Sequence, residues 1–119
     1  MTSMGGVNRL RNERFKCEKC DKAFRDDEVR NSWRCPICGE YILIYAEDEE
    51  TNTNIVLIRK PASEVEVRDL IYLPGSLTKE PYQVVSVNDL GAKLGIGLKG
   101  YGRYKVTPDD TVNCRYGAW

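Results

Sequence analysis

The chain has 119 residues, with 18 basic and 18 acidic side chains, five cysteines and no histidine, and 41% of its residues are hydrophobic. This length permits one ordinary domain or two very small ones, and it excludes a large buried core. Without histidine the chain lacks the commonest general base and any Ser-His or Cys-His nucleophile pair, so we expect no enzymatic activity.

No segment of the sequence is typical of membrane insertion or secretion. The longest uninterrupted apolar run is Tyr41–Ala46, far shorter than the roughly 20 residues of a membrane helix, and the N-terminus lacks the apolar stretch of a signal peptide. We therefore expect a soluble, cytoplasmic protein without a membrane partner. The balanced charge is unevenly distributed: residues 7–25 hold seven basic and three acidic side chains, and residues 26–54 hold two and eight. Any anion binding must be local.

Residues 1–14 are predicted to form a flexible basic arm. The first positions are mostly small residues, and Arg9, Arg11 and Arg14 follow them. A terminal segment of this kind is poorly ordered unless other parts of the protein hold it in place. The three arginines are candidate nucleic-acid contacts, because arginine neutralises phosphate.

Two Cys-x-x-Cys pairs form the most specific pattern in the chain. Cys17 and Cys20 make the first pair, and Cys35 and Cys38 make the second after an interval of 14 residues. Two residues between the thiols allow a tight turn to point both sulfurs at one centre, and two such turns complete a tetrahedron around a metal ion. Because four thiolates fill every position of a tetrahedral site, the pattern predicts one structural Zn²⁺ and no catalytic metal.

The residues around these pairs resemble the zinc-ribbon family. The first knuckle reads Cys17-Glu-Lys-Cys20, and the second reads Cys35-Pro-Ile-Cys38-Gly39 and precedes the strand-like run Tyr41–Ala46. Zinc ribbons occur in transcription factors, ribosomal proteins, nucleases and partner-binding adaptors, so the resemblance implies a metal and a shape but no single task.

Other cysteine chemistry is possible for the same pattern. An iron site resembling that of rubredoxin uses the same four sulfurs and stays an alternative. Two disulfides would need an oxidising compartment, against which the missing signal peptide and the odd fifth cysteine both argue. That fifth cysteine, Cys114, is expected to be a small buried or half-buried residue.

Strand-like segments make up most of the remaining chain, so the predicted fold class is mainly β. Residues 41–46 and 54–59 are rich in β-branched and aromatic side chains and flank the acidic loop Glu47–Glu50, which predicts a hairpin. Further strands are predicted at residues 65–67, 70–73, 82–87, 94–98, 104–106 and 112–116, with a short helical turn at residues 107–110.

Pro61 interrupts further pairing after the second of these strands, so we place a domain boundary there. The predicted domains are a four-cysteine zinc ribbon over residues 15–60 and a second unit over residues 61–119. The strand layout of this second unit resembles a small SH3-like antiparallel barrel. Such barrels bind RNA or proline-rich peptides, so the resemblance implies a binding module without choosing its ligand.

The stretch from residue 93 to residue 105 combines basic and aromatic residues and contains no acid. Basic side chains neutralise phosphates, and tyrosine rings stack on unpaired bases, so the stretch is the best candidate for a nucleic-acid surface. The simpler interpretation is a solvated barrel face with tyrosines in the core. The candidate residues are Lys93, Lys99, Tyr101, Arg103, Tyr104 and Lys105.

Together these features predict a small non-enzymatic zinc-binding module that contacts nucleic acid or a protein of the transcription or translation machinery. The competing hypothesis is a protein adaptor or inhibitor, in which the loop Glu47–Glu50 or an exposed ribbon strand docks a protein partner. A third hypothesis is a rubredoxin-like electron carrier.

Overall fold

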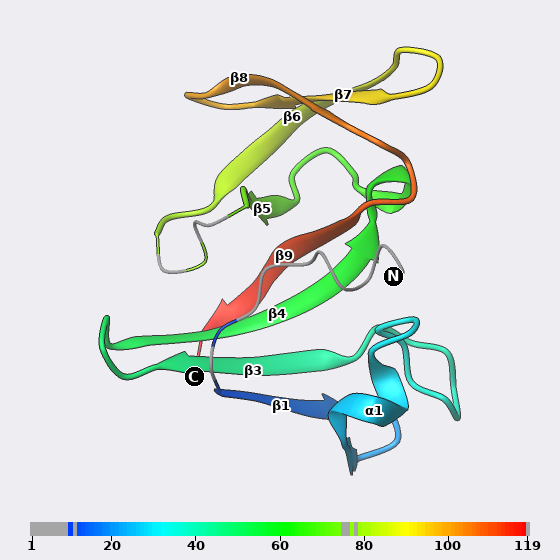
Figure 1. The fold of residues 1–119 in the computed structure, drawn as a ribbon, viewed down its shortest axis with the longest axis vertical. Helices are drawn as coiled ribbons and strands as arrows, with labels where there is room; N and C mark the ends of the chain where they lie inside the picture. Colours follow the sequence, from blue (N-terminus) through cyan, green and yellow to red (C-terminus); the bar gives the residue numbers. More distant parts are fainter. Residues whose placement is uncertain (1–9, 11, 75–76, 78, 119) are drawn as a thin grey trace.

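The computed structural model describes residues 10, 12–74, 77 and 79–118, which form nine strands with short helical segments between them (Figure 1). The helical segments are the α-helix α1 (Asp26–Val29) and the 3₁₀ helix η2 (Ala62–Glu64). The strands are β1 (Asn12–Cys17), β2 (Lys22–Phe24), β3 (Leu43–Asp48), β4 (Thr53–Pro61), β5 (Leu70–Tyr72), β6 (Tyr82–Asp89), β7 (Leu94–Leu98), β8 (Gly102–Val106) and β9 (Thr111–Ala118).

All nine strands belong to one open antiparallel sheet, so the prediction of a mainly β fold is confirmed. Their order across the sheet is β2-β1-β3-β4-β9-β5-β6-β7-β8, which leaves β2 and β8 at its two edges. Figure 1 shows β6, β7 and β8 at the top of the molecule, β4 and β9 across the middle, and β1 and α1 at the bottom. Within the described part of the chain, no helix has the length and apolar character needed to cross a membrane.

The strands β1, β3 and β4 pair around a shared apolar face. Phe15 lies opposite Ile44, and Ile44 lies opposite Leu57, and all three side chains are buried. Residues directly opposite each other in antiparallel strands share a face, so this row forms the core side of these three strands. A turn at residues 49–52 joins β3 to β4, which confirms the hairpin predicted around the acidic loop.

Strand β1 begins at Asn12, within the segment predicted as the flexible arm. The rest of that arm, apart from Leu10, lies outside the described residues. The core-facing positions of β1 are Glu13, Phe15 and Cys17. Because only one of these three is a large apolar residue, the strand lacks the alternating pattern by which a strand is normally identified.

The short helix α1 begins at a run of three acidic residues. Its Arg25 amide donates a hydrogen bond to Glu28 Oε1 (2.8 Å), and Asp26, Asp27 and Glu28 occupy the first turn. Carboxylates are favourable there because the first amides of a helix carry no internal partner. The run therefore starts a helix, whose last residue, Val29, is fully buried.

The last strand, β9, joins the two halves of the chain. It pairs with β4 along the whole ladder from Ile55↔Ala118 to Pro61↔Thr111, with one bulge near Val56. On its other side it pairs with β5. Backbone hydrogen bonds therefore connect residues 15–60 directly to residues 61–119, and the independent folding of the two predicted domains stays a prediction.

Two short segments downstream of Pro61 differ from their predicted structure. Residues 65–67 lie in the loop after η2 instead of a strand, where the Val65 amide donates to the Ala62 carbonyl (3.1 Å). Residues 107–110 form a tight turn instead of a helical turn, because the Asp110 amide bonds the Thr107 carbonyl (3.0 Å) and the Asp110 carboxylate accepts from the Thr107 amide (3.1 Å). The turn at residues 107–110 also accepts backbone hydrogen bonds from η2, because the Ala62 amide donates to the Asp110 carbonyl (2.8 Å) and the Ser63 amide donates to the Pro108 carbonyl (3.1 Å).

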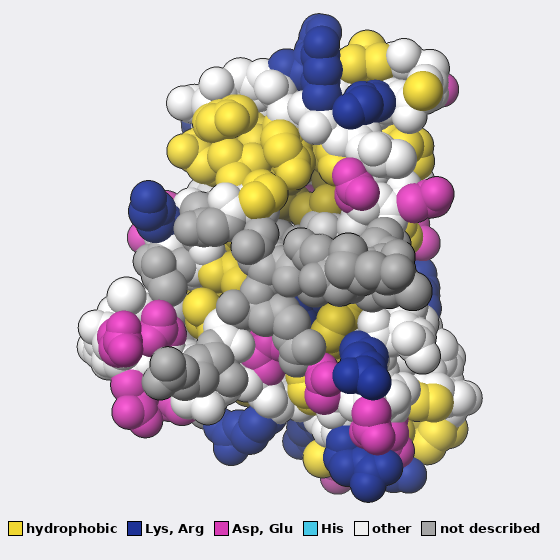
Figure 2. All heavy atoms as spheres, in the orientation of Figure 1, with side chains coloured by type: hydrophobic (Ala, Val, Ile, Leu, Met, Phe, Trp, Pro, Cys, Tyr) yellow, Lys and Arg dark blue, Asp and Glu magenta, His cyan; other side chains and the backbone are white. Residues whose placement is uncertain are grey.

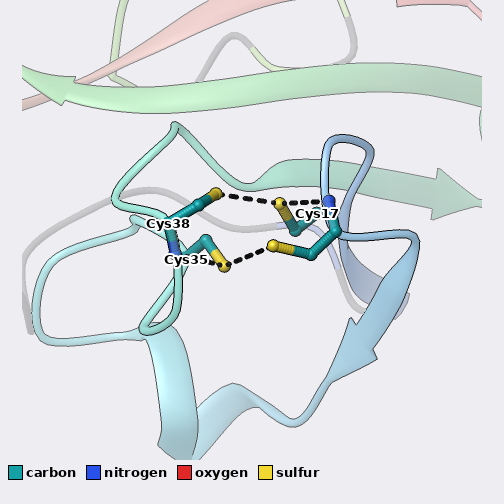
Figure 3. A group of neighbouring side chains, drawn as sticks. Cys17, Cys35 and Cys38 are labelled. Atoms are coloured by element: carbon teal, nitrogen blue, oxygen red, sulfur yellow. Dashed lines mark hydrogen bonds between the residues drawn. The ribbon is translucent and has the colours of Figure 1, made fainter.

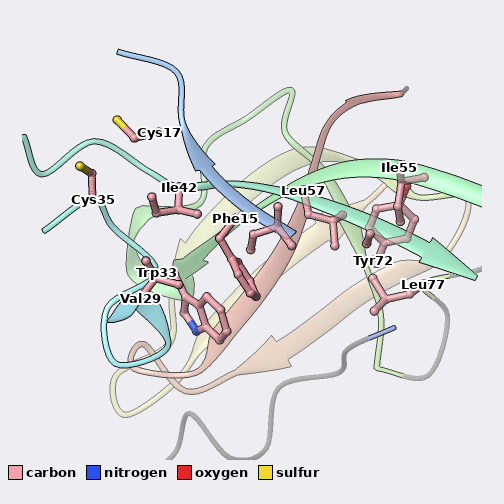
Figure 4. Close-up of a cluster of buried hydrophobic side chains, with 12 residues drawn as sticks. Phe15, Cys17, Val29, Trp33, Cys35, Ile42, Ile55, Leu57, Tyr72 and Leu77 are labelled. Atoms are coloured by element: carbon pink, nitrogen blue, oxygen red, sulfur yellow. The ribbon is translucent and has the colours of Figure 1, made fainter. Parts of the chain in front are cut away.

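The buried side chains form two clusters, one on each half of the molecule. In the first, Cys17 and Cys35 lie at one end and Ile55, Tyr72 and Leu77 lie at the other (Figure 4). This first cluster is built around the side chains of Phe15, Val29, Trp33, Ile42, Ile44, Ala46 and Leu57. The second cluster is built around Ile71, Val84, Ile96, Leu98, Val106, Val112 and Cys114.

An ion pair is buried within the first half. The guanidinium of Arg59 donates two hydrogen bonds to the Glu13 carboxylate (3.0 and 2.6 Å), and the side chains are 0% and 2% exposed. Its third donor, Nε, bonds Asn113 Oδ1 (2.7 Å), and its Cζ lies 4.5 Å from the ring centre of Trp33. These contacts tie β1, β4 and β9 to the segment that precedes the second knuckle.

Candidate metal centre

The four cysteines of the two Cys-x-x-Cys pairs converge on one point (Figure 3). Their sulfur atoms all lie within 4.8 Å of one another. Two contacts join the two pairs, because Cys17 Sγ lies 3.5 Å from Cys38 Sγ and Cys35 Sγ lies 3.9 Å from Cys20 Sγ. The centre thus links the end of β1 to the turn that precedes β3.

Tight turns hold each pair in place and direct amide groups at the sulfurs. In the first turn the Cys20 amide donates to Cys17 Sγ (3.4 Å). In the second, the amides of Ile37 and Cys38 donate to Cys35 Sγ (3.3 and 3.5 Å). Gly39 closes the second turn with a φ of 79°, a conformation that glycine adopts without steric cost.

These surroundings shift the pKa values of the thiols in opposite directions. Burial raises the pKa of Cys35, but the hydrogen bonds from the Cys38 and Ile37 amides stabilise its thiolate, and the net effect lowers the pKa to about 6. A hydrogen bond with the Cys38 thiol, together with burial, raises the pKa of Cys20 to about 12. A divalent cation at the centre would deprotonate all four sulfurs, because a coordinating thiol loses its proton outright.

The geometry fits a tetrahedral thiolate site. Sulfurs about 2.3 Å from a central ion at tetrahedral angles lie about 3.8 Å apart. Two contacts between the pairs, 3.5 and 3.9 Å, bracket that value, and all four sulfurs lie within 4.8 Å of one another. Cys17, Cys20, Cys35 and Cys38 could therefore hold a metal ion. The site is closed, since four sulfurs occupy every position at which a water or substrate could bind.

An ionic cluster fastens the second knuckle to the other half of the chain. Arg34 donates to the Gly39 carbonyl (3.0 Å) and to Glu64 Oε1 in η2 (2.6 Å). The Tyr41 hydroxyl also donates to Glu64, and the Arg34 guanidinium lies 4.3 Å from the Tyr41 ring centre. Burial and the Glu64 carboxylate raise the pKa of Tyr41 to about 12. Sequence reasoning missed Glu64, because no local signal connects it to the knuckle.

A cleft of about 440 Å³ opens beside the metal centre. Its apolar surface comes from Leu43 and Ile58, and Tyr116 lies at the cleft with 59% of its surface exposed. Cys17, Glu18, Lys19, Glu40 and Tyr41 complete the lining. The cleft thus lies between the first knuckle, β3, β4 and β9.

The predicted nucleic-acid residues fall into separate regions of the structure. Arg14 is exposed on β1, in the ribbon, and Arg9 and Arg11 lie outside the described residues. At the opposite edge of the sheet, Lys93 and Lys99 lie in the loops flanking β7, Tyr101 lies in the turn before β8, and Arg103 and Lys105 lie on β8, all of them exposed. Tyr104 packs against the second cluster, as the simpler interpretation of the tyrosines expects.

Cys114 lies away from the metal centre, in the second cluster, and is 2% exposed. Burial raises the pKa of its thiol to about 12. The prediction of a small buried residue is therefore confirmed.

No protein family, curated protein or solved structure matches this chain. The resemblances to a zinc ribbon and to an SH3-like barrel therefore depend on the knuckle residues and the strand layout alone. Function has to be argued from the metal centre and from the charged and apolar surfaces around it.

Proposed function

We propose that this protein is a non-enzymatic zinc-binding module of the cytoplasm, in which one Zn²⁺ held by Cys17, Cys20, Cys35 and Cys38 organises the first half of the fold. The observation that carries this proposal is the convergence of the four thiols within 4.8 Å. The closed donor set excludes a bound water or substrate, so the ion supplies folding energy instead of chemistry.

The proposed architecture is a zinc ribbon followed by an SH3-like unit. The two knuckles and the strands β1 to β4 support the ribbon. The five strands β5 to β9 support the second unit, whose ladder order β9-β5-β6-β7-β8 is open between β8 and β9.

Metal analysis tests the centre directly. Purified protein should contain about one zinc per chain and be colourless, whereas an iron-loaded protein would absorb visible light and favour the electron carrier. Cys20→Ser should lose the metal, and Cys114→Ser should keep it as the matched control.

Because structural zinc contributes roughly 10 to 16 kcal/mol in small domains, chelation should abolish the circular dichroism of the ribbon. Full retention of structure after chelation would contradict the proposal.

We further propose that the module contacts nucleic acid. Support comes from the exposed basic residues at the β7–β8 edge of the sheet, where no acid occurs between residues 93 and 105. Fluorescence anisotropy with labelled RNA and single-stranded DNA at low salt tests this proposal. If four cations contact phosphates, affinity should fall about 50-fold between 50 and 200 mM salt. Absence of association at low salt would refute it.

A protein adaptor is the second candidate, and the cleft beside the metal centre favours it. Its apolar floor and the exposed ring of Tyr116 could receive a side chain of a protein partner. A protein partner captured after nuclease treatment should no longer be captured by Tyr116→Ala. The matched control is Tyr101→Ala, which removes a tyrosine of similar exposure (52%) outside the cleft and should still capture the partner. Equal capture by both variants would contradict this use of the cleft.

A further inference from the structure

We infer that one face of the β6–β7–β8 sheet is the nucleic-acid contact surface and that it takes a single strand. We call it the hairpin face and define it by Ser86, Asn88, Gly95, Gly97, Arg103 and Lys105. This inference rests on the proposed nucleic-acid function and assigns to it a place and a class of ligand.

Strand register places the two cations of β8 side by side on this face. Arg103 lies opposite Gly97 and Lys105 lies opposite Gly95, and these glycines lie opposite Ser86 and Asn88 of β6. Residues two apart on a strand are about 6.6 Å apart, so the two cations can contact neighbouring phosphates. The opposite side of the same strands carries Ile96 and Tyr104, which pack into the second cluster.

The middle of the hairpin face has no side chains of its own, and neighbouring side chains cover it, so that Gly95 is buried and Gly97 is half-buried. A methyl group added at Gly97 would collide with Ser86 Oγ, and one added at Gly95 would lie 3.1 Å from Arg103 Cδ. The glycines therefore let neighbouring side chains lie flat across the sheet. Val85 and Leu90 border this area and are 51% and 42% exposed, so they offer apolar contact to a base.

Two exposed lysines extend the hairpin face beyond the strands. Lys93 precedes β7 and Lys99 follows it. The exposed ring of Tyr101, in the turn before β8, instead lies 5.3 Å, centre to centre, from the ring of Tyr82, which packs against the second cluster, so Tyr101 belongs to the opposite side of the sheet. Figure 2 shows lysine and arginine side chains at the top of the molecule, over β7 and β8.

The shape of the surface favours a single strand over a duplex. The major groove of DNA admits a helix or a two-stranded ribbon, whereas the hairpin face spans three strands. Bases can reach Val85 and Leu90 only when they are unpaired, because a duplex presents its phosphates on the outside and keeps its bases stacked inside.

The test measures anisotropy of labelled oligo(U), oligo(dT) and a duplex of equal length with metal-loaded protein. Both single strands should bind more tightly than the duplex, and their ratio reports RNA or DNA preference. Arg103→Gln combined with Lys105→Gln should weaken single-strand binding at least about tenfold and reduce the salt slope by about 1.4. Tyr101→Ala, which removes an exposed ring on the cluster side of the sheet, should change single-strand binding less than about twofold.

The matched control is Lys22→Gln combined with Arg30→Gln, which removes the same charge near the opposite edge of the sheet and should change affinity less than about twofold. If binding is unchanged in the variant with Arg103→Gln and Lys105→Gln, or falls equally in the control, the hairpin face is not the contact surface. The proposed nucleic-acid function would still hold. If the duplex binds as tightly as the single strands, the inference that the surface takes a single strand is wrong. If none of the probes binds, both proposals are wrong. Unchanged circular dichroism and metal content exclude unfolding as the cause.

Discussion

The Arg59–Glu13 pair is the strongest single polar contact between the strands of the first half. Both charged side chains are buried, and the guanidinium donates hydrogen bonds to the Glu13 carboxylate and to Asn113 Oδ1. Forming such a pair costs desolvation energy, and removal of one partner leaves an isolated buried charge. The pair therefore ties β1 to β4 across the intervening strand β3, through two residues that lie far apart in sequence.

Glu13→Gln should lower the free energy of unfolding by about 3 to 5 kcal/mol, because Arg59 keeps its charge in a buried site without an opposite one. Urea denaturation of the metal-loaded protein measures this change. Glu49→Gln, in the exposed turn between β3 and β4, is the matched control and should change stability by less than about 0.5 kcal/mol. Similar effects for the two variants would contradict the role given to the pair.

The buried thiol of Cys114 should make stability fall at alkaline pH. Burial raises its pKa from an ordinary value of 9.0 to about 12, so the unfolded chain ionises first. Stability contributed by the neutral thiol is complete below pH 9 and is lost as pH rises toward 12, on the order of 1 kcal/mol per pH unit. Urea unfolding between pH 8 and 10.5 should show a shallower decline for Cys114→Ala. Parallel declines would refute this account, since the knuckle cysteines titrate alike in both proteins.

At the scale of elements, the contact between the second knuckle and η2 depends on one carboxylate. Glu64 accepts from Arg34 and from the Tyr41 hydroxyl, and the Arg34 and Glu64 side chains are 39% and 38% exposed. A pair with this exposure contributes little to global stability. Its effect should appear instead in the local ionisation of Tyr41.

Glu64→Gln should lower the pKa of Tyr41 from about 12, because the variant removes the negative charge beside the phenol, while burial continues to raise the pKa. Ultraviolet titration of tyrosinate should then show one tyrosine ionising earlier than in the parent protein. Glu66→Gln, an exposed acid two residues away, should leave the titration unchanged. The same curve for Glu64→Gln and the parent would show that the carboxylate does not act on Tyr41.

The elements that could be predicted from sequence are those with a local signal. The spacing of the cysteines predicted the thiol cluster, and runs of β-branched and aromatic residues predicted β3, β4 and β6. The alternation of Leu94, Ile96 and Leu98 with glycine and lysine predicted β7. Strand β1 lacks such a run, because a charged Glu13 occupies one of its buried positions. The segment 107–110 has a threonine, a proline and two aspartates, which suit a helix start as well as a tight turn. Tertiary contacts decide such cases.

At the scale of the molecule, sequence patterns could not reveal which strands are neighbours. The apolar residues around Val112 predicted a last strand, but nothing in them indicates β4 as its partner. Likewise the hairpin face became visible only when register placed Arg103 and Lys105 on one side and Tyr104 on the other. Periodicity gives the face of a residue within its own strand, whereas the neighbour across the sheet depends on the whole chain.

The β4–β9 ladder should make the two buried clusters unfold together. Trp33 reports on the first cluster and Cys114 on the second. In a Trp119→Phe background, urea should change Trp33 fluorescence and the alkylation rate of Cys114 with the same midpoint. Two separate midpoints would show instead that the segments before and after Pro61 unfold as independent domains.

The position of β9 in the sheet also has a consequence for biosynthesis. Strand β4 leaves the ribosome long before its neighbour, since residues 111–118 are translated last among the strands. Until then the growing polypeptide presents the unpaired edge of β4, and such an edge invites pairing with other nascent chains. Early metal capture by the knuckles would limit this hazard, because it fixes β1 and β3 against β4 while translation continues.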